Sequence, residues 1–231
     1  MWVDRYDRHR RRDPVSDIAT SFAADDYEYP KSAPVDRAER GPLDDQEAGS
    51  VKPAIDLGAV RIEPRRGLQM RLEVEKTNNR VVAVTLEIDG STVQVQPFAA
   101  PRSTGLWLGI RQQISDQVSK QGGTVDARDG EFGPELLAQV PVQSGGQYST
   151  RTVRFIGVDG PRWFLRGVIG GPAAGDLAAA DTIHEVFRSI VVVRGDTPMP
   201  PRELLPLKMP PAADNPAATS APAEPQADAG A

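Results

Sequence analysis

The residues of this sequence with the most potential for chemistry are arginines interleaved with aromatic residues in the segment 151–166. Guanidinium groups beside aromatic rings bind phosphate, carboxylate or single-stranded nucleic acid when the side chains share one face of a sheet. Alternatively, each arginine pairs with an acid on a neighbouring strand or helix. We retain one candidate set for binding a small ligand or anion, which consists of Arg154, Arg162, Arg166 and Trp163.

The same segment has the pattern of a β-hairpin. Asp159-Gly160 is a frequent two-residue hairpin turn, and apolar residues flank it on both sides. The expected opposite pairs are Phe155 with Phe164 and Ile156 with Trp163. Both faces of the hairpin then carry large apolar groups, which is typical of a central strand pair that is covered on both sides. In this register Arg154 and Arg166 point to opposite faces, so they do not form one patch.

Nucleophilic, metal and cofactor chemistry receive little support. The chain has no cysteine, which excludes disulfides and thiolate sites. Its histidines are separated: His9 lies in a charged N-terminal segment and His184 lies in a predicted helix. We interpret His184 as a solvent-exposed residue tuned by its helix neighbours. No serine occurs in a G-x-S-x-G turn and no loop matches a phosphate-binding motif, so we predict no catalytic residue, metal or cofactor.

Two groups of carboxylates remain as candidates for acid–base work or for binding a hard cation. The groups are Glu73 with Glu75, and Asp126, Asp129 and Glu131 around Arg128. All of them fall on polar strand faces or near turns. We therefore interpret them as solvated surface charges.

Composition and charge restrict the class of partner. The formal net charge is −5 and the pI is about 5.2, which argues against a nucleic-acid-binding protein. A short basic run at 8–12 is surrounded by aspartates, so we interpret it as part of a mixed-charge tail. No apolar run has the length of a signal peptide or a membrane span, so we expect a cytoplasmic protein without membrane insertion.

Hydrophobic periodicity predicts strands with period two and helices with period 3.6. The central helix carries Trp107, Ile110, Ile114 and Val118, with Ser103 or Thr104 as its N-cap. A loop is expected at 143–150. The other expected elements are strands at 55–62, 68–74, 82–88, 92–98, 124–132, 135–142, 153–158, 163–169 and 190–193, and a second helix at 176–189.

These elements predict an α+β fold. We expect a single, mainly antiparallel β-sheet flanked by two main helices, an α/β/α sandwich. The expected organisation is a disordered N-terminal tail (1–50), the α+β domain (51–197), an extended Pro/Leu arm (198–210) and a disordered Ala/Pro tail (211–231). We expect the arm to lie on the domain, and we note its leucines as a candidate interaction site: Leu204, Leu205 and Leu207.

Three stretches are similar to a known family. They are QPFAAPRSTGLW (96–107), FIGVDGPRWFLRGVI (155–169) and VFRSIVVVRGDTPMPPRELLPL (186–207). With GPLD at 41–44, they resemble the actinobacterial domain-of-unknown-function family 3710, which brings no established activity. At the level of fold only, the strand order resembles PsbP-like α/β/α sandwiches, whose members are mostly non-enzymatic binders. Fold does not fix function, so this resemblance only favours a binder over an enzyme.

Three functions remain open. The first is a non-catalytic protein-interaction or regulatory module, because tails that fold on a partner suit regulatory contacts. The second is a small-ligand or anion-binding domain that uses the arginines beside the aromatic hairpin. The third is an enzyme of unrecognised type. We expect a protein partner, but the sequence gives neither its identity nor the oligomeric state.

Overall fold

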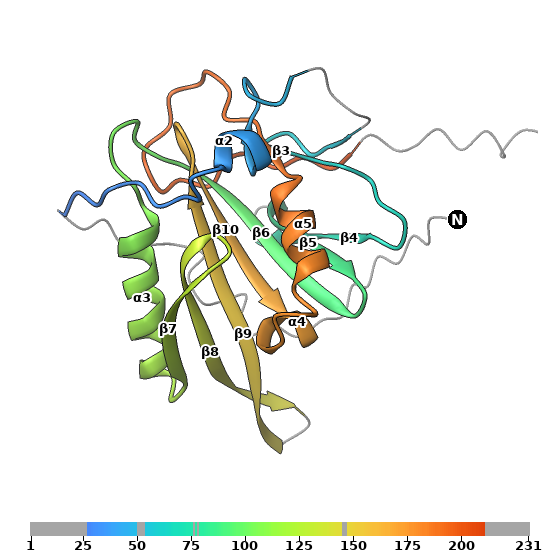
Figure 1. Cartoon of the computed structure of the whole chain (residues 1–231), viewed down its shortest axis with the longest axis vertical. Coiled ribbons are helices and arrows are strands. Elements are labelled where there is room, and N and C mark those ends of the chain that lie inside the picture. Colours follow the sequence, from blue (N-terminus) through green and yellow to red (C-terminus); the bar gives the residue numbers. More distant parts are fainter. Residues whose placement is uncertain (1–26, 50–53, 76, 78, 145–146, 211–231) are drawn as a thin grey trace, which may run out of the picture.

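The structure is a computed structural model that describes residues 27–49, 54–75, 77, 79–144 and 147–210. A seven-stranded antiparallel sheet forms its centre, in the order β4-β5-β6-β10-β9-β8-β7 (Figure 1). The strands are β4 (Gln69–Glu75), β5 (Arg80–Ile88), β6 (Ser91–Ala99), β7 (Thr124–Gly130), β8 (Gly133–Ser144), β9 (Gln147–Asp159) and β10 (Trp163–Gly170). The expected loop at 143–150 is wrong, because β8 and β9 extend into it.

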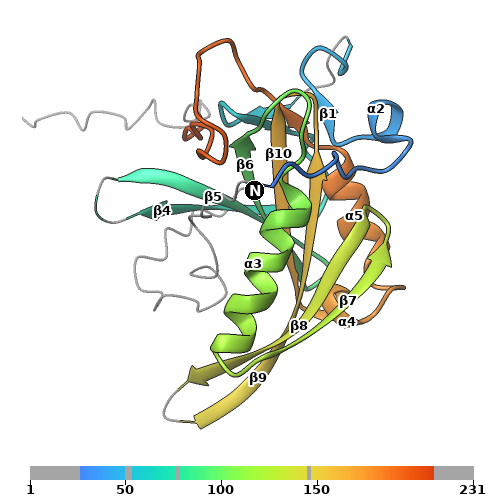
Figure 2. The same cartoon turned by 90° about the vertical axis from the view of Figure 1, so that its left-hand side faces the viewer.

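One helix covers one face of this sheet and two shorter helices lie on the other (Figures 1 and 2). The long helix α3 (Trp107–Lys120) buries Trp107, Ile110, Ile114 and Val118, as the periodicity predicts. The opposite face carries α4 (Pro172–Gly175) and α5 (Asp181–Arg188). The second helix is therefore shorter than the expected 176–189, because residues 176–180 form a bend and a turn instead of helix. The sheet thus lies between two apolar cores.

Of the two hairpin turns predicted at Asp-Gly dipeptides, the structure contains one and replaces the other. Asp89 and Gly90 join β5 to β6 with φ of 50° and 74°, as a type I′ turn requires. In the β9–β10 hairpin, by contrast, Phe164 pairs with Asp159, and Phe155 pairs with Val168. The expected register is therefore wrong. The shift is even, so each side chain keeps its expected face.

The register shifts because the turn moves to Pro161-Arg162. The Gly160 N–H donates to the Trp163 carbonyl over 2.8 Å, which closes the turn around these two residues. Proline fixes φ in the range that the first turn position needs. Asp159 is thereby released from the turn, and its carboxylate accepts hydrogen bonds inside the protein.

A second small sheet corrects the expectation of a single sheet. Its order is β1-β11-β3-β2, and β1 runs parallel to β11. The strands are β1 (Leu43–Asp44), β2 (Ile55–Asp56), β3 (Val60–Ile62) and β11 (Val191–Val192). Val60, Ile62 and Val192 join the core beneath α5. Alternation predicts that a segment is a strand, but it does not say which sheet the strand joins.

Residues 27–49 also differ from the expected N-terminal tail. Tyr29 forms a β-bridge with Gly105, α2 (Arg37–Arg40) follows, and β1 pairs with β11. The Trp163 indole N–H donates to Asp44 over 2.8 Å. Because this segment is held by hydrogen bonds more than by apolar side chains, its sequence lacks the hydrophobic pattern that predicts folded structure. The predictions for 1–26 and 211–231 lie outside the described residues.

The C-terminal arm packs on the domain and links the two sheets. Leu205 donates its N–H to the Pro97 carbonyl over 2.9 Å, and Lys208 donates to the Leu57 carbonyl over 2.8 Å. The arm thus lies beside the last residues of β6, which do not pair with β5. Leu205 is completely buried and Leu207 nearly so.

Candidate functional site

The structure separates the four residues that form the candidate set. Arg154 on β9 and Arg166 on β10 are both fully buried, and they lie on opposite faces of the sheet. Burial lowers the pKa of Arg166 to about 10, while Glu73 acts to raise it. Trp163 is fully buried in the core beneath α5. Arg162 lies in the β9–β10 turn, at the surface. No single ligand therefore contacts all four.

Arg154 belongs to a buried polar cluster between the sheet and α5. We call it the β8–α5 cluster and define it by Arg128, Glu135, Arg154 and His184. Two nitrogens of Arg154 donate to the Ala174 carbonyl of α4 over 3.1 and 3.0 Å, and its third lies 3.6 Å from Glu135. Arg128 on β7 places its Nε 3.7 Å from the same carboxylate oxygen. Glu135 on β8 thus lies between two guanidinium groups.

Burial shifts the protonation equilibria of this cluster. Burial raises the pKa of Glu135, against the opposing effect of Arg154 and Arg128. It also lowers the pKa of Arg154. For His184, burial and then the charge of Arg154 lower the pKa, although Glu131 and Asp181 act in the other direction. His184 is only 9% exposed and packs edge-on against Phe132, so our interpretation of it as solvent-exposed is wrong.

Arg188, one helical turn after His184, links the end of α5 to the β7–β8 turn and to the N-terminal segment. Its guanidinium donates to Glu131 in the β7–β8 turn over 2.9 and 2.7 Å. It also lies 3.4 Å from Asp36 and over the ring of Phe132. The carboxylate of Glu131, which we interpret as a surface charge, therefore holds the end of α5 against the sheet.

A second site is an open hollow at the surface, which we call the basic hollow. It is lined by Lys31, Gln46, Arg102, Pro161, Arg162 and Asp196, and its volume is about 600 Å³. Lys31 is held in place because its ammonium donates to the Pro101 and Gly160 carbonyls. Arg162 donates to the Gly195 carbonyl over 3.3 Å and lies 3.7 Å from Asp196. Three cations thus share the hollow with one carboxylate.

Asp159 positions two walls of the basic hollow. Its buried carboxylate accepts N–H groups from Ser32 over 3.0 Å and from Leu106 over 2.9 Å. The second contact caps α3, so the helix takes its cap from β9 rather than from the expected Ser103 or Thr104. Asp159 therefore fixes the segment that carries Lys31 beside the loop that carries Arg102.

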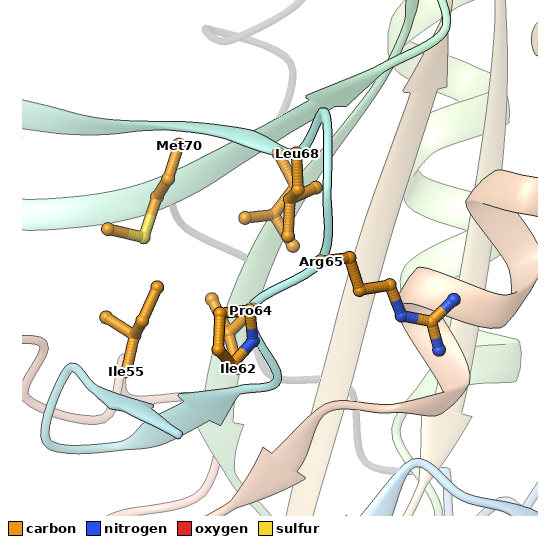
Figure 3. Close-up of a pocket in the computed structure, with 7 residues that line it drawn as sticks. Ile55, Ile62, Pro64, Arg65, Leu68 and Met70 are labelled. Atoms are coloured by element: carbon orange, nitrogen blue, oxygen red, sulfur yellow. The ribbon is translucent and has the colours of Figure 1, made fainter. Parts of the chain in front are cut away.

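A third hollow is small and apolar. It lies between the small sheet and the β4–β5 hairpin and is lined mainly by Ile55, Ile62, Pro64, Leu68 and Met70, with Arg65 at its side (Figure 3). Its volume of about 20 Å³ corresponds to roughly one water molecule. Arg65 donates to Glu185 of α5 over 3.0 Å. This hollow is a packing gap rather than a ligand site.

Sequence reasoning missed several residues of these sites, namely Lys31, Arg102 and Glu135. Glu135 alternates with Leu136 in a strand, and this pattern predicts a solvent-facing acid. Its neighbours in the folded protein are Arg128 on β7, Gly130 at the end of β7 and Arg154 on β9, and Glu135 is buried among them. Lys31 falls in a segment without helix or strand periodicity, so nothing local marks it. In the described part of the chain, no group of three or more metal-ligating side chains occurs.

These observations define a class: an α+β domain with an antiparallel sheet between helices, a buried arginine–glutamate cluster and a basic surface hollow. The chain belongs to the family described as protein of unknown function, DUF3710, whose model matches residues 41–216. No curated protein matches the chain. Within the described residues, none of the helices has the length and hydrophobicity needed to cross a membrane.

One solved structure shows a weak likeness. It is the solution structure of cyanobacterial PsbP (CyanoP) from Synechocystis sp. PCC 6803, with 12% sequence identity and a TM-score of 0.36. The match covers 62% of this chain and 95% of the other. At this level of similarity, nothing about the activity of the present chain follows from it.

Proposed function

We propose that this protein is a non-catalytic protein-interaction module that binds an acidic segment of a partner protein in the basic hollow. The observation that carries the proposal is the convergence of Lys31, Arg102 and Arg162 on one open surface. Asp196 is the one carboxylate among the described lining residues, and the buried carboxylate of Asp159 also acts on Lys31. Asp196 is fully exposed, so water screens its charge and leaves the cations available. Complementary charge of this kind selects partners and accelerates their association.

The surrounding structure supports a preorganised surface. Lys31 is fixed by two carbonyls and Arg162 by the Gly195 carbonyl, so binding costs little side-chain entropy at these positions. Arg102 is exposed and makes no hydrogen bond or ion pair to any part of the chain that the structure describes. The leucines of the C-terminal arm contact their own domain, and we therefore place the partner at the hollow rather than at the arm.

The test compares the full chain with two charge-reversed variants that have equal net charge. R102E/R162E changes the hollow, and R66E/R71E changes two exposed arginines outside it. Each tagged chain is purified from the cells that naturally express it, and co-purifying proteins are quantified by mass spectrometry. A protein retained by the wild type and by R66E/R71E but lost from R102E/R162E is the expected result.

The retained protein is then titrated against the purified full chain at about 0.05 M and about 0.5 M salt. Binding through the hollow should weaken strongly at the higher concentration because exposed charges are screened. Identical sets of proteins from all three chains, or an affinity that does not depend on salt, would overturn the proposal.

A further inference from the structure

The β8–α5 cluster contains several buried polar atoms that the protein leaves without a hydrogen bond. Among the described residues, these are Nε and one terminal nitrogen of Arg128, one terminal nitrogen of Arg154, Oε2 of Glu135 and Nε2 of His184. Buried polar groups are almost always satisfied by protein or by an ordered guest. The two arginine–glutamate separations of 3.6 and 3.7 Å also exceed a hydrogen bond. Ordered water or a small polar ligand satisfies buried atoms of this kind.

The free donors indicate the chemistry of that guest. Arg128 offers Nε together with a terminal nitrogen, which is an edge that binds two oxygens of one oxyanion. Arg154 offers a donor near the same oxygen of Glu135. Two guanidinium charges face one carboxylate in the buried part of the cluster, so one positive charge is left over. Asp126 lies 4.0 Å from Arg128 but is 73% exposed, so water screens it.

We propose that a small oxyanion binds between Arg128 and Arg154, beneath α5, and accepts the hydrogen bonds that Glu135 does not complete. Inorganic phosphate and a small carboxylate share this chemistry. The proposed ligand is separate from the acidic segment in the basic hollow. The side chain of Arg128 is 32% exposed and lies on the edge strand β7, which gives the anion a path from solvent.

Glu135 must lose its negative charge when the anion binds, because two neighbouring negative charges repel. Its raised pKa means that the buried carboxyl takes up a proton more readily than an exposed glutamate. A protonated Glu135 donates a hydrogen bond instead of repelling the anion. We therefore expect anion binding to be accompanied by proton uptake and to strengthen as the pH falls below neutrality. Other titratable or charged groups facing the cluster are Asp126, Glu131, Asp181, His184 and Arg188.

The experiment titrates the full chain with inorganic phosphate and, separately, with acetate, at constant ionic strength. Calorimetry in two buffers of different ionisation enthalpy measures affinity and proton uptake together. Spectra of the arginine Nε–H groups report which guanidinium contacts the anion. The variants are Arg128→Gln, which changes a partly exposed cluster residue, and R102Q/R162Q, which removes two cations of the basic hollow.

We expect one of the two anions to bind the wild type with proton uptake and to shift the Nε–H signals of Arg128 and Arg154. Arg128→Gln should weaken binding about tenfold, while R102Q/R162Q should leave it unchanged. Binding that survives Arg128→Gln and disappears in R102Q/R162Q would assign the anion to the hollow and overturn the inference. The absence of heat and of signal shifts with both anions would also overturn it, since ordered water would then fill the cluster.

Discussion

At the scale of single residues, buried charges at the ends of a strand and of a helix connect elements that are distant in the sequence. Asp159 joins the N-terminal segment to α3, and Arg188 joins α5 to the β7–β8 turn. Such contacts are costly to leave incomplete, because a buried donor or acceptor without a partner loses its hydration. Apolar packing supplies most of the stability of a folded domain, so these contacts matter mainly where they hold distant segments together.

His184 gives a testable pH dependence at this scale. Its pKa in the folded state is lowered by burial and by Arg154. Below about pH 6.5 the unfolded chain takes up a proton on this histidine that the folded chain does not, so stability falls as the pH falls. The contribution to the slope is at most about 1.4 kcal/mol per pH unit for one proton.

Urea unfolding at pH 7.5, 6.5 and 5.5 measures this slope for the wild type and for His184→Gln. We expect the variant to lose less stability over this range than the wild type. Glu135 and Asp159, whose raised pKa values have the opposite effect as the pH falls, are common to both chains and cancel in the comparison. Equal slopes for the two chains would contradict the prediction.

At the scale of elements, the C-terminal arm behaves as part of the fold. The arm hydrogen-bonds to the part of β6 that does not pair with β5. It also hydrogen-bonds to Leu57 and Ala59 in the turn between β2 and β3 of the small sheet. Leu205 lies within the core beneath α5, whereas Leu204 packs against the core beneath α3. The arm thus places adjacent leucines in two different cores.

Leu205→Ala tests the role of the arm. Removing a fully buried leucine side chain leaves a cavity and should lower the free energy of unfolding by about 3 kcal/mol. Met209→Ala, at a residue that is 55% exposed, is the control and should change it by less than about 0.5 kcal/mol. Urea unfolding at neutral pH measures both. Equal small effects would show that the arm is not docked in solution.

At the scale of the whole molecule, the N-terminal boundary of the folded unit lies before the position predicted from the sequence. Residues 27–49 supply the β1 strand, the Ser32 contact with Asp159 and the Asp36 contact with Arg188. These contacts reach the small sheet, α5 and the end of β9, where the Asp159 carboxylate also caps α3. They connect the layers on the two sides of the main sheet.

Truncation tests this boundary. A chain that starts at Val51 loses all of these contacts and should be less stable by about 3 kcal/mol or more, which lowers Tm by about 10 °C. A chain that starts at Asp26 keeps the contacts and serves as the control. Thermal unfolding followed by circular dichroism measures both. The prediction fails if the two truncated chains have the same Tm.

Much of the main sheet could be predicted from the sequence because its signals are local. Alternation in β4, β5 and β6, the apolar run of β10, the Asp89-Gly90 turn and the apolar stripe of α3 depend on residues that are close in the chain. The opposite orientations of Arg154 and Arg166 followed from the same alternation. The β9–β10 register did not, because it depends on what Asp159 contacts elsewhere.

The sequence by itself determined the α+β class, the faces of the central hairpin and the family. Tertiary structure alone decided that the short strands form a second sheet, that Glu135 and His184 are buried, and that Lys31, Arg102 and Arg162 share one hollow. The reason is physical. Periodicity reports which way a side chain points relative to its own strand or helix, whereas burial and convergence depend on which distant segment packs against it.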